Sequence, residues 1–102
     1  CIRDRTVIFC MNDLMAGGCY DWADESGIKI PQEISVAGYD NRELSSYYKP
    51  PLSTTELPLH DIGYRAAEVM IGLVEKKSGE TAEPQVYKVP CKQLIRQSIK
   101  TL

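Results

Sequence analysis

Two polar pairs in the sequence stand where a ligand could be held. The pairs Asn12-Asp13 and Asp40-Asn41 each follow an apolar run of five or six residues. An ionised carboxylate offers two acceptor oxygens, and a side-chain amide offers both a donor and an acceptor. Asp40 is therefore suited to capture vicinal sugar hydroxyls or the N–H of a base edge, with Asn12 as a second contact. The competing interpretation is that each residue only caps the helix or turn that follows it.

The elements around these pairs predict how they are positioned. The apolar runs 6–11 and 34–38 do not alternate, which is typical of strands buried on both faces of a parallel sheet. Between them, apolar residues recur at helical spacing from Leu14 up to Gly27, a glycine suited to end a helix. Within this helix, Gly17-Gly18 indicates close packing. Because ligands bind beyond the carboxyl ends of parallel strands, both polar pairs are expected at one rim of the sheet.

The rest of the chain continues the alternation of strands and helices. The pattern predicts a short helical turn over 42–48, a β-prone stretch over 52–56, a helix from Leu59 to about Ser78-Gly79, a polar loop over 80–84 and a strand over 85–89. The spacing of apolar residues in 91–99 fits a short helix better than a strand. The fold class predicted is α/β with a mostly parallel sheet.

Enzyme, metal and cofactor sites are not predicted. His60 is the only histidine, and the sequence has neither a glycine-rich phosphate loop nor a nucleophile elbow. The four cysteines, at 1, 10, 19 and 91, lack zinc-ligand spacing and are expected to be reduced thiols of a cytoplasmic protein. We therefore expect no enzyme activity, no metal and no cofactor.

Charge and hydropathy exclude two further classes. The net charge of −2 disfavours a stand-alone nucleic-acid binder, and no apolar run is long enough to span a membrane. One sparse basic row could contact phosphates, but a solvated face is the favoured interpretation. Its members recur every four residues: Lys88, Lys92, Arg96 and Lys100.

Four segments together resemble a known family. They are FCMNDLMAGG at 9–18, IPQEISVAGYDN at 30–41, PPLSTT at 50–55 followed by Pro58 and Ile62-Gly63, and LIRQS at 94–98. In this order and spacing they resemble the LacI/GalR family of bacterial transcription repressors. Members carry an N-terminal helix-turn-helix and a two-lobed effector core like that of periplasmic sugar-binding proteins.

The resemblance implies a partial core of the type I periplasmic-binding-protein-like fold that spans both lobes. Residues 1–56 would belong mainly to the C-terminal lobe, and residues 57–90 would add a helix and a strand to the N-terminal lobe. Residues 91–102 would return to the C-terminal lobe, which favours a strand over the helix predicted from spacing. The chain is thus expected to be a fragment of a longer protein.

The resemblance also implies site residues. Asp40 falls on the family's effector-binding aspartate and Asn12 on an asparagine that contacts ligand hydroxyls, whereas Asp13 is expected to be structural. Leu57 stands where the family often has glutamine, so a polar contact is missing or is supplied by Glu56. Leu59 would line the apolar wall of the pocket. Residues near a dimer interface would be Gly17, Tyr47, Tyr48, Leu52, Ser53 and Thr54.

The function implied is that of the effector-sensing and dimerising part of a repressor. A small molecule, expected to be a sugar, would change DNA affinity by rearranging the lobes. Operator DNA would be contacted only through an N-terminal module absent from this chain. The alternative is a periplasmic sugar-binding component of a transporter, which has the same core fold.

Overall fold

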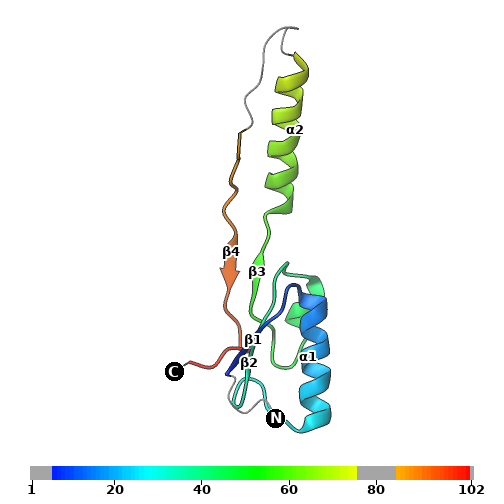
Figure 1. The fold of residues 1–102 in the computed structure, drawn as a ribbon, viewed down its shortest axis with the longest axis vertical. Helices are drawn as coiled ribbons and strands as arrows, with labels where there is room; N and C mark the ends of the chain where they lie inside the picture. The colour runs from blue at the N-terminus through cyan, green and yellow to red at the C-terminus, as the bar shows by residue number, and fades with distance from the viewer. Residues whose placement is uncertain (1–5, 76–84, 102) are drawn as a thin grey trace. The chain divides into compact units, whose positions relative to one another are not determined.

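The computed structural model describes residues 6–75 and 85–101, which separate into two compact units. The first unit comprises Cys1–Leu57 and Lys92–Leu102, and the second Pro58–Cys91. The first contains β1 (Val7–Phe9), α1 (Asp13–Ser26), β2 (Ser35–Ala37), η1 (Glu43–Ser46), β3 (Thr54–Glu56) and β4 (Lys92–Leu94), and the second contains α2 (Leu59–Glu75). Figure 1 follows these elements along the chain. The assignment of the units to lobes of a larger core remains a prediction.

The strands β1 and β2 form the parallel pair predicted from the two apolar runs. Val7 pairs with Ser35 and Phe9 with Ala37. The expectation that the first run is buried on both faces is wrong for β1, since Val7 is 55% and Phe9 66% exposed. The physical reason is that too few of the described residues pack on these two side chains, whereas Val36 of β2 in the same sheet is fully buried.

Helix α1 has the two ends that the sequence predicts. Asn12 caps its first turn, with Oδ1 accepting a hydrogen bond from the Met15 N–H at 2.8 Å. Gly27 closes the helix in the left-handed conformation, with φ of 70°. Close packing occurs at Gly17, where a Cβ atom would lie 2.7 Å from the Tyr48 hydroxyl, but not at Gly18, which has open space beside it.

A small core holds the first unit together. Its buried members are Cys10, Ala16, Val36 and Leu52. Partly buried side chains pack against them, among them Tyr20 and Tyr48, whose rings stack with centroids 4.8 Å apart. The core therefore joins β1, α1 and β2 to the chain that leads into β3.

The last segment is a strand, so the helix predicted from its apolar spacing is wrong. β4 pairs antiparallel with β3, with Thr54 opposite Leu94 and Glu56 opposite Lys92. Beyond β4, the Ser98 hydroxyl donates to the Val36 carbonyl at 2.6 Å and accepts from the Ser53 N–H at 2.7 Å. These long-range bonds decide the conformation, and local periodicity does not contain them.

The second unit consists of α2 and the segment 85–90. The helix has apolar residues along one face, where Ile62, Val69, Met70 and Leu73 line one groove. Residues 85–90 do not form the predicted strand, since the described residues offer them no strand to pair with. The predicted helix end near Ser78-Gly79 and the polar loop over 80–84 lie outside the described residues, as does Cys1.

Candidate functional site

The register of the parallel pair brings the two polar loops to the same rim. Phe9 lies opposite Ala37, and both Asn12 and Asp40 come three residues later. The backbone N–H of Asp13 donates to the Tyr39 carbonyl at 3.0 Å, which ties the two loops together directly. The sequence prediction that Asn12 and Asp40 follow neighbouring strands is therefore confirmed by the geometry.

Asp40 and Asn41 form a left-handed turn at this rim. Their φ angles are 113° and 54°, values that residues with a side chain rarely adopt. Such conformations cost on the order of 1–3 kcal/mol each and persist only where the surroundings fix them. The turn is thus a place where the fold accepts strain to hold a carboxylate in a set position.

Three consecutive backbone N–H groups fix this turn. The N–H of Asp40 donates to the Thr55 carbonyl at 3.0 Å, and that of Asn41 donates to the Thr54 hydroxyl at 3.3 Å. The N–H of Arg42 donates to Oδ2 of Asp13 at 2.7 Å. None of these three backbone donors remains for a ligand, so a donor to a ligand at this turn has to come from a side chain.

The Asp40 carboxylate lies beside a cation that our sequence analysis did not identify. Oδ2 of Asp40 accepts from Nε of Arg42 at 3.3 Å, and the two side chains are 28% and 59% exposed. The pair therefore presents acceptor and donor groups side by side at an open surface. A charged residue two positions after the predicted site aspartate was the available signal.

Glu56 adjoins Asp40 through the backbone. The two residues form an isolated parallel bridge at the end of β3. Glu56 is half-buried, so its carboxylate is a second acceptor near the same rim. The structure thus brings together Asn12, Asp40 and Glu56, three of the four predicted effector residues.

The helix cap uses only the oxygen end of the Asn12 side chain. Its Oδ1 is committed to the cap of α1. Its side-chain NH₂ is the group that can be offered to a ligand. Capping and ligand contact, which the sequence presented as alternatives, are therefore chemically compatible at this residue.

The structural role predicted for Asp13 is confirmed. Its side chain is fully buried, and Oδ1 accepts from the Thr54 hydroxyl at 2.7 Å while Oδ2 accepts from the Arg42 N–H. Gly38 leaves room for it, because a Cβ atom at Gly38 would overlap Oδ1 of Asp13. Asp13 consequently links α1, the Asp40 turn and β3 from inside the unit.

The predicted interface residues differ in exposure, and their place near a dimer interface stays a prediction. Leu52, Ser53 and Thr54 are 0%, 1% and 5% exposed, so their side chains pack inside the unit. Tyr48 donates its hydroxyl to the Asp13 carbonyl at 3.0 Å and is half-buried beside Gly17. Tyr47 differs, with 74% of its surface exposed.

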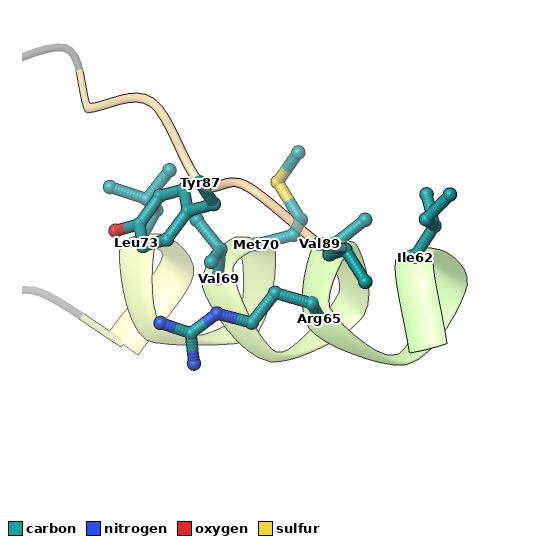
Figure 2. Close-up of a pocket in the computed structure, with 8 residues that line it drawn as sticks. Ile62, Arg65, Val69, Met70, Leu73, Tyr87 and Val89 are labelled. Atoms are coloured by element: carbon teal, nitrogen blue, oxygen red, sulfur yellow. The ribbon is translucent and has the colours of Figure 1, made fainter. Parts of the chain in front are cut away.

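Leu59 lies in the other unit, at the first position of α2, and is 68% exposed. Its part in the pocket wall remains a prediction. Figure 2 shows a groove of about 500 Å³ in this unit, between α2 and the segment 85–90. Its lining is mostly apolar, and its one charged member, Arg65, lies over the Tyr87 ring at 4.8 Å. This groove lacks the acceptors that a hydroxylated ligand requires.

The thiol of Cys10, in the core, is a poor nucleophile. Sγ of Cys10 and Sγ of Cys19 lie 3.4 Å apart, and both cysteines are free. Burial, followed by the hydrogen bond with Cys19, raises the pKa of Cys10 to about 12. Burial likewise raises the pKa of Tyr20 to about 12. The Cys10 thiol and the Tyr20 hydroxyl therefore stay neutral near pH 7, and both side chains serve packing.

The described residues contain neither a candidate metal site nor a candidate membrane-spanning helix. Within 6–75 and 85–101, no three His, Cys, Asp or Glu side chains are grouped so that they could hold a metal ion. In the same ranges, neither helix has the length and apolar character needed to cross a membrane.

Comparison with known proteins decides the family. Residues 4–99 match the periplasmic binding protein-like domain. The HTH-type transcriptional repressor PurR of Vibrio atlanticus is 39% identical over 97 residues, which are 95% of this chain and 28% of that protein. The chain belongs to the LacI/GalR family, as part of its periplasmic-binding-protein-like effector region.

Solved LacI-family structures agree with this assignment. A LacI family regulator from Enterococcus faecium with bound ribose matches with a TM-score of 0.74 and 31% identity, covering 92% of this chain and 34% of that one. The lac repressor dimer bound to operator and the anti-inducer ONPF matches with a TM-score of 0.78 and 29% identity, covering 92% and 32%. This LacI/GalR chain thus has the fold of part of such an effector core.

Proposed function

We propose that this chain is the effector-sensing part of a transcription repressor and that it binds a sugar at the rim formed by Asn12, Asp40 and Glu56. The observation that carries the proposal is the strained, fully tethered turn that holds the Asp40 carboxylate at the end of the parallel sheet. Strain of this kind is concentrated at functional sites. The bound ribose of the Enterococcus faecium regulator supports a sugar as the ligand class.

The chemistry of the rim suits vicinal hydroxyl groups. Asp40 supplies acceptor oxygens, Glu56 adds a second carboxylate, and the Asn12 NH₂ supplies a donor. Charge-assisted hydrogen bonds of this type are about twice as strong as neutral ones.

In this proposal the sugar acts by changing the balance between two lobe arrangements. A ligand shifts that balance only by its difference in affinity for the DNA-competent and DNA-incompetent states. The complete protein would work in the cytoplasm as a dimer and contact operator DNA through a module outside this chain, as the lac repressor dimer does with its operator. Because the chain spans 28% of the length of its PurR relative, these properties are proposals for the whole protein.

A thermal-shift screen of sugars and nucleobases on the complete protein tests the ligand class. A sugar present at 100 times its dissociation constant stabilises the folded state by about 2.7 kcal/mol, which raises the melting temperature by a few degrees. D-Ribose is the first probe, and the Asp40→Asn variant is the control that should show a clearly smaller shift. Stabilisation by nucleobases alone would contradict the sugar assignment.

One finding keeps a transporter component as the second candidate. The matching family is described as periplasmic binding protein-like, and the core fold serves both functions. Sequence-specific DNA binding by the complete protein favours the repressor. Sugar binding by a complete protein that does not bind DNA would favour the transporter component.

A further inference from the structure

One member of the basic row is less exposed than the other three. Lys88, Lys92 and Lys100 are exposed, but Arg96 is half-buried. A solvated face was expected for the whole row, and Arg96 is the exception to be explained. An arginine taken from water is retained only where its donors are satisfied.

The guanidinium of Arg96 is held by three acceptors. Nη1 donates to the Ser45 hydroxyl at 2.8 Å and to the Leu52 carbonyl at 2.9 Å, and Nη2 donates to Oδ1 of Asn41 at 3.0 Å. The backbone N–H of Arg96 also donates to the Ser53 hydroxyl at 2.8 Å. The residue is therefore fixed by main chain and side chain together.

These acceptors surround the Asp40 turn. Asn41 is the left-handed residue directly after Asp40, and Ser45 lies in η1, where its hydroxyl is 3.4 Å from the same Asn41 oxygen. Leu52 leads into β3, the strand whose Thr55 carbonyl accepts the Asp40 N–H. Arg96 thus ties together the segment that leaves the turn and the strand against which the turn is held.

We propose that Arg96 is the positioning residue for the Asp40 carboxylate. This inference rests on the proposed function of Asp40. A rigid, planar guanidinium can hold three acceptors that lie apart, whereas a lysine ammonium at the end of a flexible stem cannot match that fork. Arg96 contacts the turn through the Asn41 side chain and sets the orientation of Asp40 indirectly.

The first experiment needs no ligand. Hydrogen exchange is measured on the complete protein for wild type, Arg96→Met and Lys100→Met, which removes an exposed charge from the same terminal segment. Arg96→Met should speed exchange of the Asp40, Asn41 and Arg42 amides about tenfold, with α1 amides unchanged. Acceleration spread evenly over the first unit, or no acceleration at the turn, would overturn the proposal.

The second experiment asks whether positioning affects binding. Calorimetric titration with D-ribose should show about tenfold weaker affinity for Arg96→Met, unchanged affinity for Lys100→Met and partial recovery in Arg96→Lys. Equal affinity of Arg96→Met and wild type would contradict the positioning role. If Arg96→Met does not fold, Arg96→Lys replaces it in both experiments, with smaller effects of the same kind.

Failure of the proposed function has a separate signature. If wild type binds neither D-ribose nor any other sugar of the screen, the sugar proposal is contradicted, and the exchange rates at the turn still decide whether Arg96 holds it. If wild type binds D-ribose and exchange at the turn does not change in Arg96→Met, the positioning role fails and the proposed function stands.

Discussion

At the scale of single residues, the site combines strain with full hydrogen bonding. Asp40 has a φ of 113°, yet its backbone N–H and those of the next two residues are all paired. Hydrogen bonds to β3 and to Asp13 therefore hold the strained backbone in place. The Asp40 carboxylate itself remains accessible. The groups that build the rim are therefore different from the groups that can contact a ligand.

Two variants of Asn12 separate its role as helix cap from its proposed contact with the ligand. Asp is as good an N-cap as Asn, so Asn12→Asp should keep the melting temperature while the loss of the NH₂ donor weakens sugar binding about tenfold. Asn12→Ala should lose the cap as well, at a cost of about 1 kcal/mol in the free energy of unfolding. Thermal melting and calorimetry of both variants check this prediction. Undiminished binding by Asn12→Asp would restrict Asn12 to capping.

Residue types at the strand ends made part of the site predictable. The cap formed by Asn12 follows from its place directly after an apolar run, whereas the structural role of Asp13 was expected from the resemblance. The contacts of Arg42 and Arg96 could not be predicted in this way. Arg96 reaches Asn41 across 55 positions of sequence, and no local pattern encodes that approach.

At the scale of elements, parallel pairing of β1 and β2 is what creates the rim. The sequence predicts this pairing because two apolar runs flank a helix with clear end signals. It mispredicts 91–99 as a helix, since the apolar spacing there is decided by pairing with β3 and by the bonds of Ser98. Local periodicity failed where the partner lay far away in sequence.

Burial of the Cys10 thiol, which directly follows β1, gives the first unit a pH dependence. The pKa of Cys10 rises from 9.0 to about 12, so the folded state favours the protonated thiol. Its stabilising contribution is complete below pH 9 and is lost as the pH rises towards 12. Melting temperatures should therefore fall from about pH 9 upwards, and more shallowly in Cys10→Ala than in the exposed control Cys91→Ala. Equal slopes in the two variants would contradict this account.

At the scale of the whole molecule, exposed apolar surface marks where further structure is expected. Helix α2 has no buried residue, although apolar side chains lie along one face. The chain spans 28% of the length of its PurR relative, so the remaining core is available to cover such a face in the proposed complete protein. The organisation into lobes is implied by the resemblance alone and stays a prediction, because composition and length fit a small domain.

The proposed dimer is testable through an exposed aromatic residue. Tyr47 is the predicted interface residue with the largest exposed fraction, 74%, whereas Leu52 is buried inside the unit. Tyr47→Glu should shift the complete protein from dimer to monomer in analytical ultracentrifugation without lowering its melting temperature. Leu52→Ala should instead lower stability by about 2–5 kcal/mol. A dimer unaffected by Tyr47→Glu would place the interface elsewhere.

The central claim is that Asp40 binds the effector without taking part in DNA binding. Calorimetric titration of the complete protein with the strongest stabiliser from the sugar screen tests it most directly. Asn tolerates the left-handed backbone, so Asp40→Asn changes the charge while keeping the turn. The account predicts affinity weaker by about 10- to 100-fold, with operator affinity unchanged in the absence of sugar. Effector affinity equal to that of wild type would contradict the account.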